Sequence, residues 1–376
     1  MLSLTLYRWL ILGYSSVIMT PISRRQKLES LFPGAPSFRL KQMEEALFSV
    51  SLTGFGEVST MPLSMRETLT REIPWLSLRE VQTFESVKKD TYKAVVETVD
   101  GKRVETVLMK NARGQWTVCV SSQVGCAMAC TFCATGTMGF TRNLLADEIV
   151  DQVRFWNIFL SERETLSLSK GENTTSTRIS NVVFMGMGEP LANYAEVKET
   201  LRLLLTYTDI GPTRITVSTV GLIPMLDQVL KDPTWPPVRL AVSLHSADSA
   251  TRKQMMPTSY DGFLDRLAEW TDRYFAQFES RRRHLTFEYV MLSKVNDTRM
   301  HAEALIAFAR RVGKVRINLI PYNFTGSVYR DSLPGDFELF QKQLESAGVV
   351  VTRRRTMGDD IAAACGQLVV EKNTIS

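Results

Sequence analysis

The chain has 376 residues, enough for two or three domains and a full hydrophobic core. Its formal net charge of +5 is mildly basic, which favours a polyanionic partner without requiring one. Five cysteines, an odd number with three close together, argue against the disulfide framework of a secreted domain. We therefore expect a protein of the reducing cytoplasm. The two densest basic runs, residues 281–283 and 353–355, are expected to be solvated faces.

The apolar N-terminal stretch does not form a clear targeting signal or membrane span. Arg8 interrupts it, no small-residue cleavage site follows, and the run is too short to cross a bilayer. We interpret residues 1–22 as a non-native or disordered extension, with Met19 as the true first residue. No membrane association is expected.

Residues 23–80 are predicted to form a small helical accessory domain. Helical periodicity covers RRQKLESLF, FRLKQMEEALFSV and MRETLTREI, and prolines and glycines separate these segments. No binding motif is visible in them, so a packing role and an RNA-docking role are equally consistent with the pattern.

Residues 81–115 change to the two-residue period of β-strands. TYKAVVETV and KRVETVLM are two predicted strands, and the Asp100-Gly101 pair between them is a strong hairpin signal. This β linker is expected to hold Glu105 within a strand.

Residues 116–350 alternate short apolar runs with helical segments. The run TVCVS leads into a cysteine-rich loop, after which Asn143 is expected to cap a helix. Five more runs follow, at Asn181–Met185, Arg214–Val217, Arg239–Leu244, Thr286–Val290 and Arg316–Ile320. This alternation predicts a parallel sheet with helical crossovers. Six units are two fewer than a closed eightfold barrel needs, so we expect an α/β fold with an open six-stranded partial (β/α)6 barrel, similar to a TIM barrel. Residues 351–376 form a C-terminal tail.

The cysteine-rich loop carries Cys126, Cys130 and Cys133 in a C-x3-C-x2-C array, so one compact loop can bring three thiolates to a single inorganic centre. A [4Fe-4S] cube binds one thiolate on each iron, and three thiolates leave the fourth iron open to a small chelating molecule. The alternative is a structural zinc site completed by Cys119 or Cys365. Three clustered cysteines without a nearby His are less usual for zinc and favour the iron-sulfur interpretation.

This array resembles the cluster motif of radical S-adenosylmethionine (SAM) enzymes, and Phe132 fits the same pattern. The resemblance implies that the amino and carboxylate groups of SAM occupy the open iron. Polar residues also follow the carboxyl ends of four predicted strands, where parallel sheets place their ligand sites. They are Gly188 and Glu189, Ser218, Ser243 and His245, and Asn323. Each alone is typical of a cap or turn, but together they predict a SAM pocket.

From about Arg24 to Leu368 the sequence resembles the RlmN/Cfr family of radical SAM methyltransferases, which methylate adenosine in ribosomal RNA. The resemblance rests on RVETV, CVSSQVGCAMACTFCATG, FMGMGEPLAN, SLHS, EYVMLSKVND, NLIPYN and GDDIAAACGQL. The match is closer to the RlmN branch, which methylates carbon 2 of an adenosine in 23S rRNA. Ala362, SLHS and NFTGS depart from the usual pattern, and Cfr-like carbon-8 methylation is the alternative.

The resemblance also implies roles for individual residues. Cys365 resembles the cysteine whose sulfur accepts a methyl group from a first SAM, Cys119 the cysteine that resolves a protein-RNA adduct by forming a disulfide, and Glu105 the general base. Positions that contact SAM are matched by Gly188, Glu189, Ser218, Ser243, Leu244, His245 and Asn323.

The implied enzyme is a cytoplasmic monomer that carries a [4Fe-4S] cluster, consumes two SAM per turnover and needs an electron donor such as flavodoxin or ferredoxin. Its substrate is 23S rRNA, and transfer RNA is a further candidate. An alternative of another class is a zinc-stabilised RNA-binding protein without catalysis.

Overall fold

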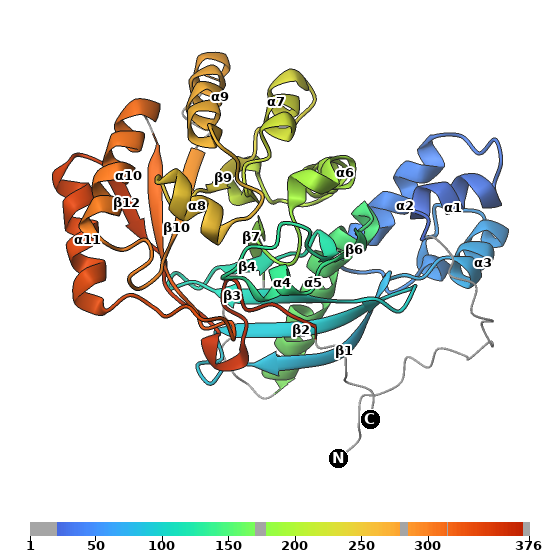
Figure 1. The fold of residues 1–376 in the computed structure, drawn as a ribbon. Coiled ribbons are helices and arrows are strands. Elements are labelled where there is room, and N and C mark those ends of the chain that lie inside the picture. The colour runs from blue at the N-terminus through green and yellow to red at the C-terminus, as the bar shows by residue number, and fades with distance from the viewer. Residues whose placement is uncertain (1–20, 170–177, 279–284, 314, 371–376) are drawn as a thin grey trace.

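The computed structural model describes residues 21–169, 178–278, 285–313 and 315–370 (Figure 1). The predicted extension, including the proposed start at Met19, lies outside these ranges except for residues 21 and 22, and so does the arginine run 281–283. Within the described residues, no helix has both the length and the apolar character needed to cross a membrane.

A ten-stranded sheet organises the molecule, in the spatial order β1-β2-β3-β4-β7-β8-β9-β10-β11-β12. Its strands are β1 (Leu78–Glu85), β2 (Thr91–Thr98), β3 (Arg103–Lys110), β4 (Trp116–Cys119), β7 (Ile179–Phe184), β8 (Ile215–Thr219), β9 (Arg239–Ser243), β10 (Leu285–Met291), β11 (Arg316–Pro321) and β12 (Val350–Arg353). Pairing is antiparallel from β1 to β4 and parallel from β4 to β12. The predicted parallel α/β architecture is therefore confirmed.

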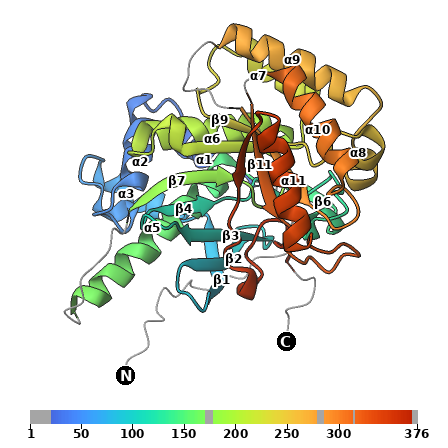
Figure 2. The same ribbon diagram turned by 90° about the vertical axis from the view of Figure 1, so that its left-hand side faces the viewer.

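The helices between the parallel strands lie along the outer side of this curved sheet (Figures 1 and 2). They are α5 (Ala146–Ser169), α6 (Tyr194–Tyr207), α7 (Ile223–Lys231), α8 (Ser249–Met255), α9 (Phe263–Gln277), α10 (Arg299–Val312) and α11 (Pro334–Ser346). Helix α6 shows why such segments fold as helices: Val197, Leu201 and Leu204 recur every three or four residues and are all fully buried.

The structure differs from the sequence prediction at both ends of the sheet. The predicted hairpin is β2 and β3, but β1 precedes it, and all three strands continue the barrel sheet. At the other end β12 is a seventh parallel strand, and it begins one residue before the predicted tail. This strand has four residues, mostly exposed, so it lacks the apolar run that marks the other parallel strands.

The prediction that Asn143 caps the first crossover helix is wrong. Asn143 is the last residue of β6 (Phe140–Asn143), and α5 begins three residues later. The side chain of Glu196 in α6 accepts from the Ala146 N–H at 2.7 Å, and the side chain of Glu148 accepts from the Leu145 N–H at 2.9 Å. A carboxylate from a neighbouring helix thus replaces the local cap.

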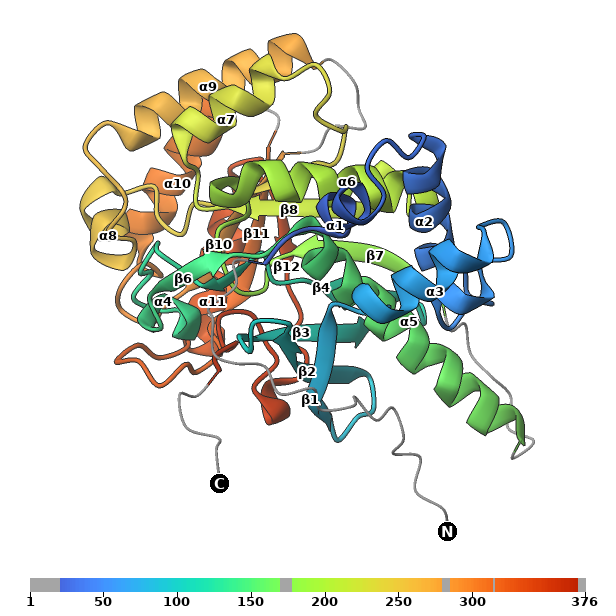
Figure 3. The same cartoon turned by 90° about the vertical axis from the view of Figure 1, so that its right-hand side faces the viewer.

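The N-terminal segment forms a separate hydrophobic cluster beside α5 and α6 (Figure 3). Its elements are α1 (Arg24–Leu31), α2 (Phe38–Phe48), η1 (Phe55–Glu57) and α3 (Leu63–Glu72). Charged groups fasten it to the barrel: buried Asp151 of α5 binds Arg24 and Arg154, and it accepts from the Ser77 N–H at 2.6 Å. Burial raises the pKa of Asp151, but the positive charges of Arg24 and Arg154 outweigh it and lower this pKa to about 2.

Asp151→Asn is expected to lower the free energy of unfolding by about 3–5 kcal/mol, because it leaves buried Arg154 without its carboxylate and buried Arg24 with only the longer 3.4 Å pair to Asp147. Anaerobic urea denaturation followed by tryptophan fluorescence measures the loss. Glu29→Gln is the matched control, since it removes only the exposed pair with Arg25 and should change stability by less than about 0.5 kcal/mol. Equal losses in the two variants would contradict a role for the buried network.

Candidate active site

The cysteine loop is closed by two short antiparallel strands, β5 (Gln123–Gly125) and β6. Gly125 has a φ of +74°, and a Cβ there would lie 1.9 Å from the carbonyl oxygen of Gly139, so only glycine permits this approach. The Cys126 N–H donates to the same carbonyl at 2.8 Å, and the Cys133 N–H donates to the Cys130 carbonyl at 3.1 Å. The backbone of the loop is therefore fixed by its own hydrogen bonds.

All five cysteines are free, and Cys126, Cys130 and Cys133 line a common pocket, here called the cluster pocket. Burial raises the pKa of Cys126 to about 11 and raises the pKa values of Cys130 and Cys133, and each thiol also feels the negative charge of at least one other cysteine. Three such thiolates become favourable only when a bound cation compensates their charge. The donor set therefore fits a thiolate-bound metal centre.

The spacing of these thiols bears on which metal centre fits. Within the described ranges, no three His, Cys, Asp or Glu side chains converge closely enough to hold one metal ion. A [4Fe-4S] cube places each cysteine on a different iron, so its ligands are further apart than those of a single ion. Three thiolates from one loop match three of the four irons of such a cube.

The cluster pocket lies at the carboxyl ends of β7 to β11 and contains about 930 Å³ of space between its walls and open mouth. Five predicted SAM-contacting residues line it: Gly188, Glu189, Ser218, Ser243 and His245. Leu244 does not; it is fully buried, and its N–H donates to the Glu288 carbonyl at 3.0 Å. Asn323 lines the neighbouring pocket instead.

Glu189 organises one wall of the cluster pocket. Its two carboxylate oxygens accept from the Leu191 N–H at 2.9 Å and the Val220 N–H at 2.7 Å. Burial raises the pKa of Glu189 to about 7, and these backbone donors oppose the rise. The Thr219 side chain also hydrogen-bonds to this carboxylate, and of the roughly four lone-pair sites of a carboxylate one remains that can accept from an ammonium group.

His245 has a φ of +56°, which directs its ring onto Phe132 edge-on at 4.9 Å between centroids. Its Nδ1 accepts from the Val290 N–H at 3.0 Å. Burial, helped by the charge of Arg252, lowers the pKa of His245 to about 3, so the ring is neutral at physiological pH. With Nδ1 an acceptor, the ring proton is on Nε2, and His245 can donate only from there.

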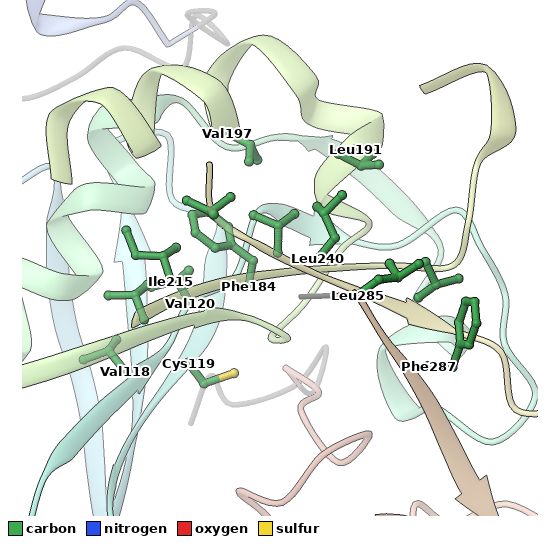
Figure 4. Packing of buried hydrophobic residues seen from close by; sticks show 14 of the residues in the cluster. Val118, Cys119, Val120, Phe184, Leu191, Val197, Ile215, Leu240, Leu285 and Phe287 are labelled. Atoms are coloured by element: carbon green, nitrogen blue, oxygen red, sulfur yellow. The ribbon is translucent and has the colours of Figure 1, made fainter. Parts of the chain in front are cut away.

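A second pocket, here called the sulfur-pair pocket, is lined by Cys119 and Cys365 together with Asn323. Figure 4 shows Cys119 beside Val118 at the margin of the packed aliphatic side chains. Burial, together with the charge of Cys365, raises the pKa of Cys119 to about 12. Cys365 also lines the cluster pocket, so the two pockets meet at its side chain.

The C-terminal segment that carries Cys365 is held on several sides. The Ala134 N–H donates to the Gly366 carbonyl at 2.8 Å, and the Thr135 hydroxyl donates to the Leu368 carbonyl at 2.6 Å. The Asn323 side-chain amide donates to the Cys365 carbonyl at 3.1 Å. Residues just after the cluster cysteines therefore position the Cys365 loop.

Glu105 is buried within β3, as predicted, but it lines neither pocket among the described residues. Its Oε2 accepts from the Val369 N–H at 2.8 Å, and its Oε1 lies 2.9 Å from Lys93 Nζ. Burial raises the pKa of Glu105, and the Lys93 charge opposes this. Lys93 also donates to the Ala362 carbonyl at 3.2 Å, so the ion pair contacts the Cys365 segment at two points.

The sequence of residues 120–305 matches a family model of the radical SAM superfamily. The crystal structure of a radical SAM methyltransferase from Sphaerobacter thermophilus is 34% identical, covers 92% of this chain and 96% of its own, and superposes with a TM-score of 0.78. The chain belongs to the radical SAM superfamily.

Two other structures match with TM-scores below 0.5. One is a domain of a pyruvate-formate lyase-activating enzyme from Bacteroides vulgatus, with 18% identity, 47% of this chain and 99% of that chain covered, and a TM-score of 0.37. The other is SuiB of Streptococcus suis bound to SAM, with 14% identity, 63% and 46% covered, and a TM-score of 0.40.

Membership of the radical SAM superfamily confirms the two predicted cofactors, a [4Fe-4S] cluster and SAM. Cys126, Cys130 and Cys133 are the residues that would hold the cluster, and the open cluster pocket beside them would hold SAM. The structural zinc alternative is set aside, because the radical SAM chemistry of the family requires an iron-sulfur centre.

Sequence reasoning missed Arg354 and Lys93. Arg354 was expected on a solvated face, yet it lines both pockets, and its backbone N–H donates to the Leu319 carbonyl at 2.8 Å. It directly follows β12, and neighbouring side chains of a strand point to opposite faces. Arg353 lies over the Phe337 ring of α11, outside both pockets, so Arg354 points to the pocket side. Recognition of that strand was the signal that could have found it. Lys93 lies in β2, and its pairing with Glu105 depends on the register between β2 and β3, which local sequence does not reveal.

Cys133→Ala is expected to abolish cluster assembly, because two remaining thiolates cannot hold the cube. Protein prepared anaerobically with iron and sulfide should contain about four of each per chain in the wild type and show a brown absorbance that reduction bleaches. Cys119→Ala is the matched control and should keep this content. Full iron loading of Cys133→Ala, or its loss in Cys119→Ala, would contradict the assignment.

Proposed function

We propose that this radical SAM protein methylates carbon 2 of an adenosine in 23S rRNA through a methylated Cys365, with two SAM consumed per turnover. The observation that carries the proposal is the position of Cys365. Its side chain lines the cluster pocket and also faces the pocket that contains Cys119. Two sulfurs beyond the three of the cluster motif are thus available to act in turn on one substrate. The methyltransferase with 34% identity supports the same reaction class.

The chemistry explains why such an apparatus is needed. Carbon 2 of adenine is electron-poor and is not a nucleophile, so it cannot attack the methyl group of SAM directly. When bound, the reduced cluster and SAM supply a 5′-deoxyadenosyl radical that can take a hydrogen atom from a methyl group. The residues of this chain must then present that methyl group and remove the surplus proton.

Cys365 would act first, as the methyl acceptor. Its sulfur attacks the methyl carbon of one SAM; the bond between that carbon and the SAM sulfur breaks, S-adenosylhomocysteine leaves, and the thiol proton is released. The resulting thioether lies at the junction of the two pockets, where one face meets SAM and the other meets the base. The hydrogen bond from Asn323 to the Cys365 carbonyl keeps the sulfur at this junction.

Cys119 would act last, as the resolving thiol. It attacks the sulfur of Cys365 in the protein-RNA adduct and forms a disulfide; the bond from that sulfur to the CH2 carbon breaks, and the carbon takes up a proton to become the methyl group of the released base. An external thiol must reduce this disulfide before the next turnover. Since burial raises the pKa of Cys119 to about 12, its ionisation needs a positive charge nearby. Arg354 provides one, since its charge lowers the pKa of this thiol.

Glu105 would be the base that removes the proton from the methylated carbon. The unpaired electron that radical addition leaves on the ring would pass to the bound cluster, and with both lost, aromaticity returns. Lys93 opposes the effect of burial on the pKa of Glu105 and so favours the ionised form that a base requires. Both residues contact the segment around Cys365, which would place base and sulfur in a fixed relation.

The substrate and partners follow from the same proposal. A base that reacts at a ring carbon must leave its stack, so the target is an unpaired or flipped adenosine in 23S rRNA, with transfer RNA as a further substrate. A cytoplasmic flavodoxin or ferredoxin would supply electrons. Cfr-like methylation of carbon 8 is the second candidate, because the departures at Ala362, SLHS and NFTGS weaken the choice between the two carbons. Mass spectrometry of digested rRNA separates 2-methyladenosine from 8-methyladenosine.

Two cysteine variants test the order of steps. Cys119→Ala should trap a covalent protein-RNA adduct, because nothing releases the crosslink to Cys365. Cys365→Ala should block methylation of the protein and form no adduct. Denaturing gels with labelled RNA, and peptide mass spectrometry after incubation with SAM, measure both effects. Unimpaired RNA methylation in the two variants would show that neither sulfur takes part.

Lys93→Met should slow methyl transfer to RNA most at low pH. Without the lysine, the pKa of Glu105 rises further, so a smaller fraction of the base is ionised and the acid limb of the pH–rate profile moves to higher pH. Single-turnover transfer from protein already methylated at Cys365 isolates this step. Lys102→Met, in the exposed hairpin turn, is the control and should leave the profile unchanged. An unshifted profile in Lys93→Met would show that the ion pair does not set the ionisation of the base.

A further inference from the structure

The side chain of Arg354 is a cation at the junction of the two pockets. It lines both of them, together with Cys365, Met185 and Ile320. About a quarter of the Arg354 side chain is exposed (24%), whereas the neighbouring Arg353 is an exposed residue. The hydrogen bond from the Arg354 backbone N–H to the Leu319 carbonyl holds the backbone of Arg354 beside β11.

The guanidinium has unused hydrogen-bonding capacity. It carries five N–H donors, yet Nη1 donates only to the thioether sulfur of Met185, at 3.2 Å, which is a weak acceptor. The nearest carboxylate oxygen, Oε2 of Glu288, is 3.8 Å away and accepts from the Asn318 amide at 2.8 Å. In the part of the chain that the structure describes, no oxygen accepts a hydrogen bond from this guanidinium.

Arg354 keeps its charge in this environment. The negative charge of Cys365 is the largest influence on its pKa and raises it; burial lowers it, and the charges of Glu288 and Cys119 raise it again. A charged, partly buried donor group with no strong acceptor is suited to a ligand that brings one.

The lining of the sulfur-pair pocket suits the faces of a flat base. The space between its walls is about 490 Å³ when the open solvent at its mouth is included. Thioether and aliphatic side chains supply apolar walls that can pack against a ring face: Met109, Met185, Ile320, Met357 and Leu368. None of the three cluster cysteines lines it, so its ligand is distinct from a SAM bound at the cluster.

We propose that Arg354 donates a hydrogen bond to the ring nitrogen beside the carbon that is methylated, and so selects an adenine and fixes which carbon faces the two sulfurs. This inference rests on the proposed function. In adenine, carbon 2 lies between N1 and N3, and carbon 8 lies beside N7; all three nitrogens are acceptors. A base whose reactive carbon lies between Cys119 and Cys365 therefore directs one of these nitrogens toward the guanidinium that borders both cysteines.

The hydrogen bond would also assist the reaction. A cationic donor on the ring nitrogen withdraws electron density from the adjacent carbon, which favours addition of a carbon radical. It stabilises the negative charge that the ring gains when the proton is removed. Arg354 would thus be a binding residue whose contact strengthens as the adduct forms.

The test combines a protein change with a base change. Wild type and Arg354→Met, each methylated at Cys365 beforehand, are given RNA hairpins whose target is adenosine, 1-deaza-, 3-deaza- or 7-deaza-adenosine, and single-turnover methyl transfer is measured. For a carbon-2 product, Arg354 binds N1 or N3. Replacing that nitrogen with carbon should slow the wild-type reaction by a factor of roughly ten or more, whereas the 7-deaza base should react at the normal rate. For a carbon-8 product the sensitive base is the 7-deaza one.

Arg354→Met should react with adenosine more slowly than wild type by a similar factor and lose most of the discrimination against the sensitive deaza base. Because both proteins meet the same altered base, the intrinsic reactivity of the analogue cancels in this comparison. Arg353→Met is the matched control: its guanidinium lies 4.3 Å over the Phe337 ring, outside both pockets, so full discrimination should remain.

Further outcomes separate the inference from the function beneath it. Normal methylation of Cys365 in Arg354→Met, seen by peptide mass spectrometry, shows an intact pocket and supports a role of Arg354 at the base. Loss of Cys365 methylation would mean that Arg354 acts in that earlier step, and would overturn the inference. Undiminished discrimination in Arg354→Met would also overturn it while the methyltransferase function stands. Absence of RNA methylation by wild type would reject the function itself.

Discussion

The position of one segment, residues 362–369, is the constraint on which the site depends. Hydrogen bonds tie it to Ala134 and Thr135 just beyond the cluster cysteines, to Asn323 after β11, and to Glu105 in β3. These anchors come from the cysteine loop, the last buried parallel strand and the antiparallel extension of the sheet. Only their convergence brings Cys365 to the point where the two pockets meet. The antiparallel strands are thus part of the site's framework, because without β3 one side of the segment would have no support.

Burial of so many sulfurs creates an electrostatic problem that the surrounding groups address. Cys119 and the three cluster cysteines all have raised pKa values, mainly because burial disfavours their thiolates. The cluster compensates three of them when it is bound, since its iron ions carry positive charge. Cys119 has no such partner, and Arg354 is the cation whose charge lowers its pKa. A single arginine therefore serves the sulfur that the cluster does not reach, and it does so from a position that also borders the base pocket.

Local patterns in the sequence predicted the parallel strands, the hairpin around Asp100-Gly101 and the cysteine loop, because each is set by residues close together in the chain. The strand-end rule also worked: Glu189, Ser218 and His245 do line one pocket, since the carboxyl ends of parallel strands share an edge. What failed depends on distant contacts. The start of α5 uses Glu196 from another helix, β12 is stabilised by pairing with β11 and not by its own burial, and the Lys93–Glu105 pair depends on sheet register. The inward position of Arg354 follows from β12 and was hidden with it.

Paired buried charges attach the N-terminal helices to α5, and this arrangement contrasts with that of the charged groups in the pockets. Asp151 lies on α5, the crossover that follows the cysteine loop, and its buried bond to Arg24 joins the accessory helices to that crossover. Arg154 of α5, paired with Asp151, adds hydrogen bonds to the Leu47 and Trp75 carbonyls. Around Arg354 and Cys365, by contrast, donor groups and thiols have no strong hydrogen-bond acceptors or counter-charges in direct contact among the described residues. Buried charges that are fully paired hold their neighbours in one arrangement, whereas unpaired donors retain the capacity to bind an incoming group. The paired charges therefore fix the N-terminal helices on α5, and the bonding capacity of the pockets is left for the substrate.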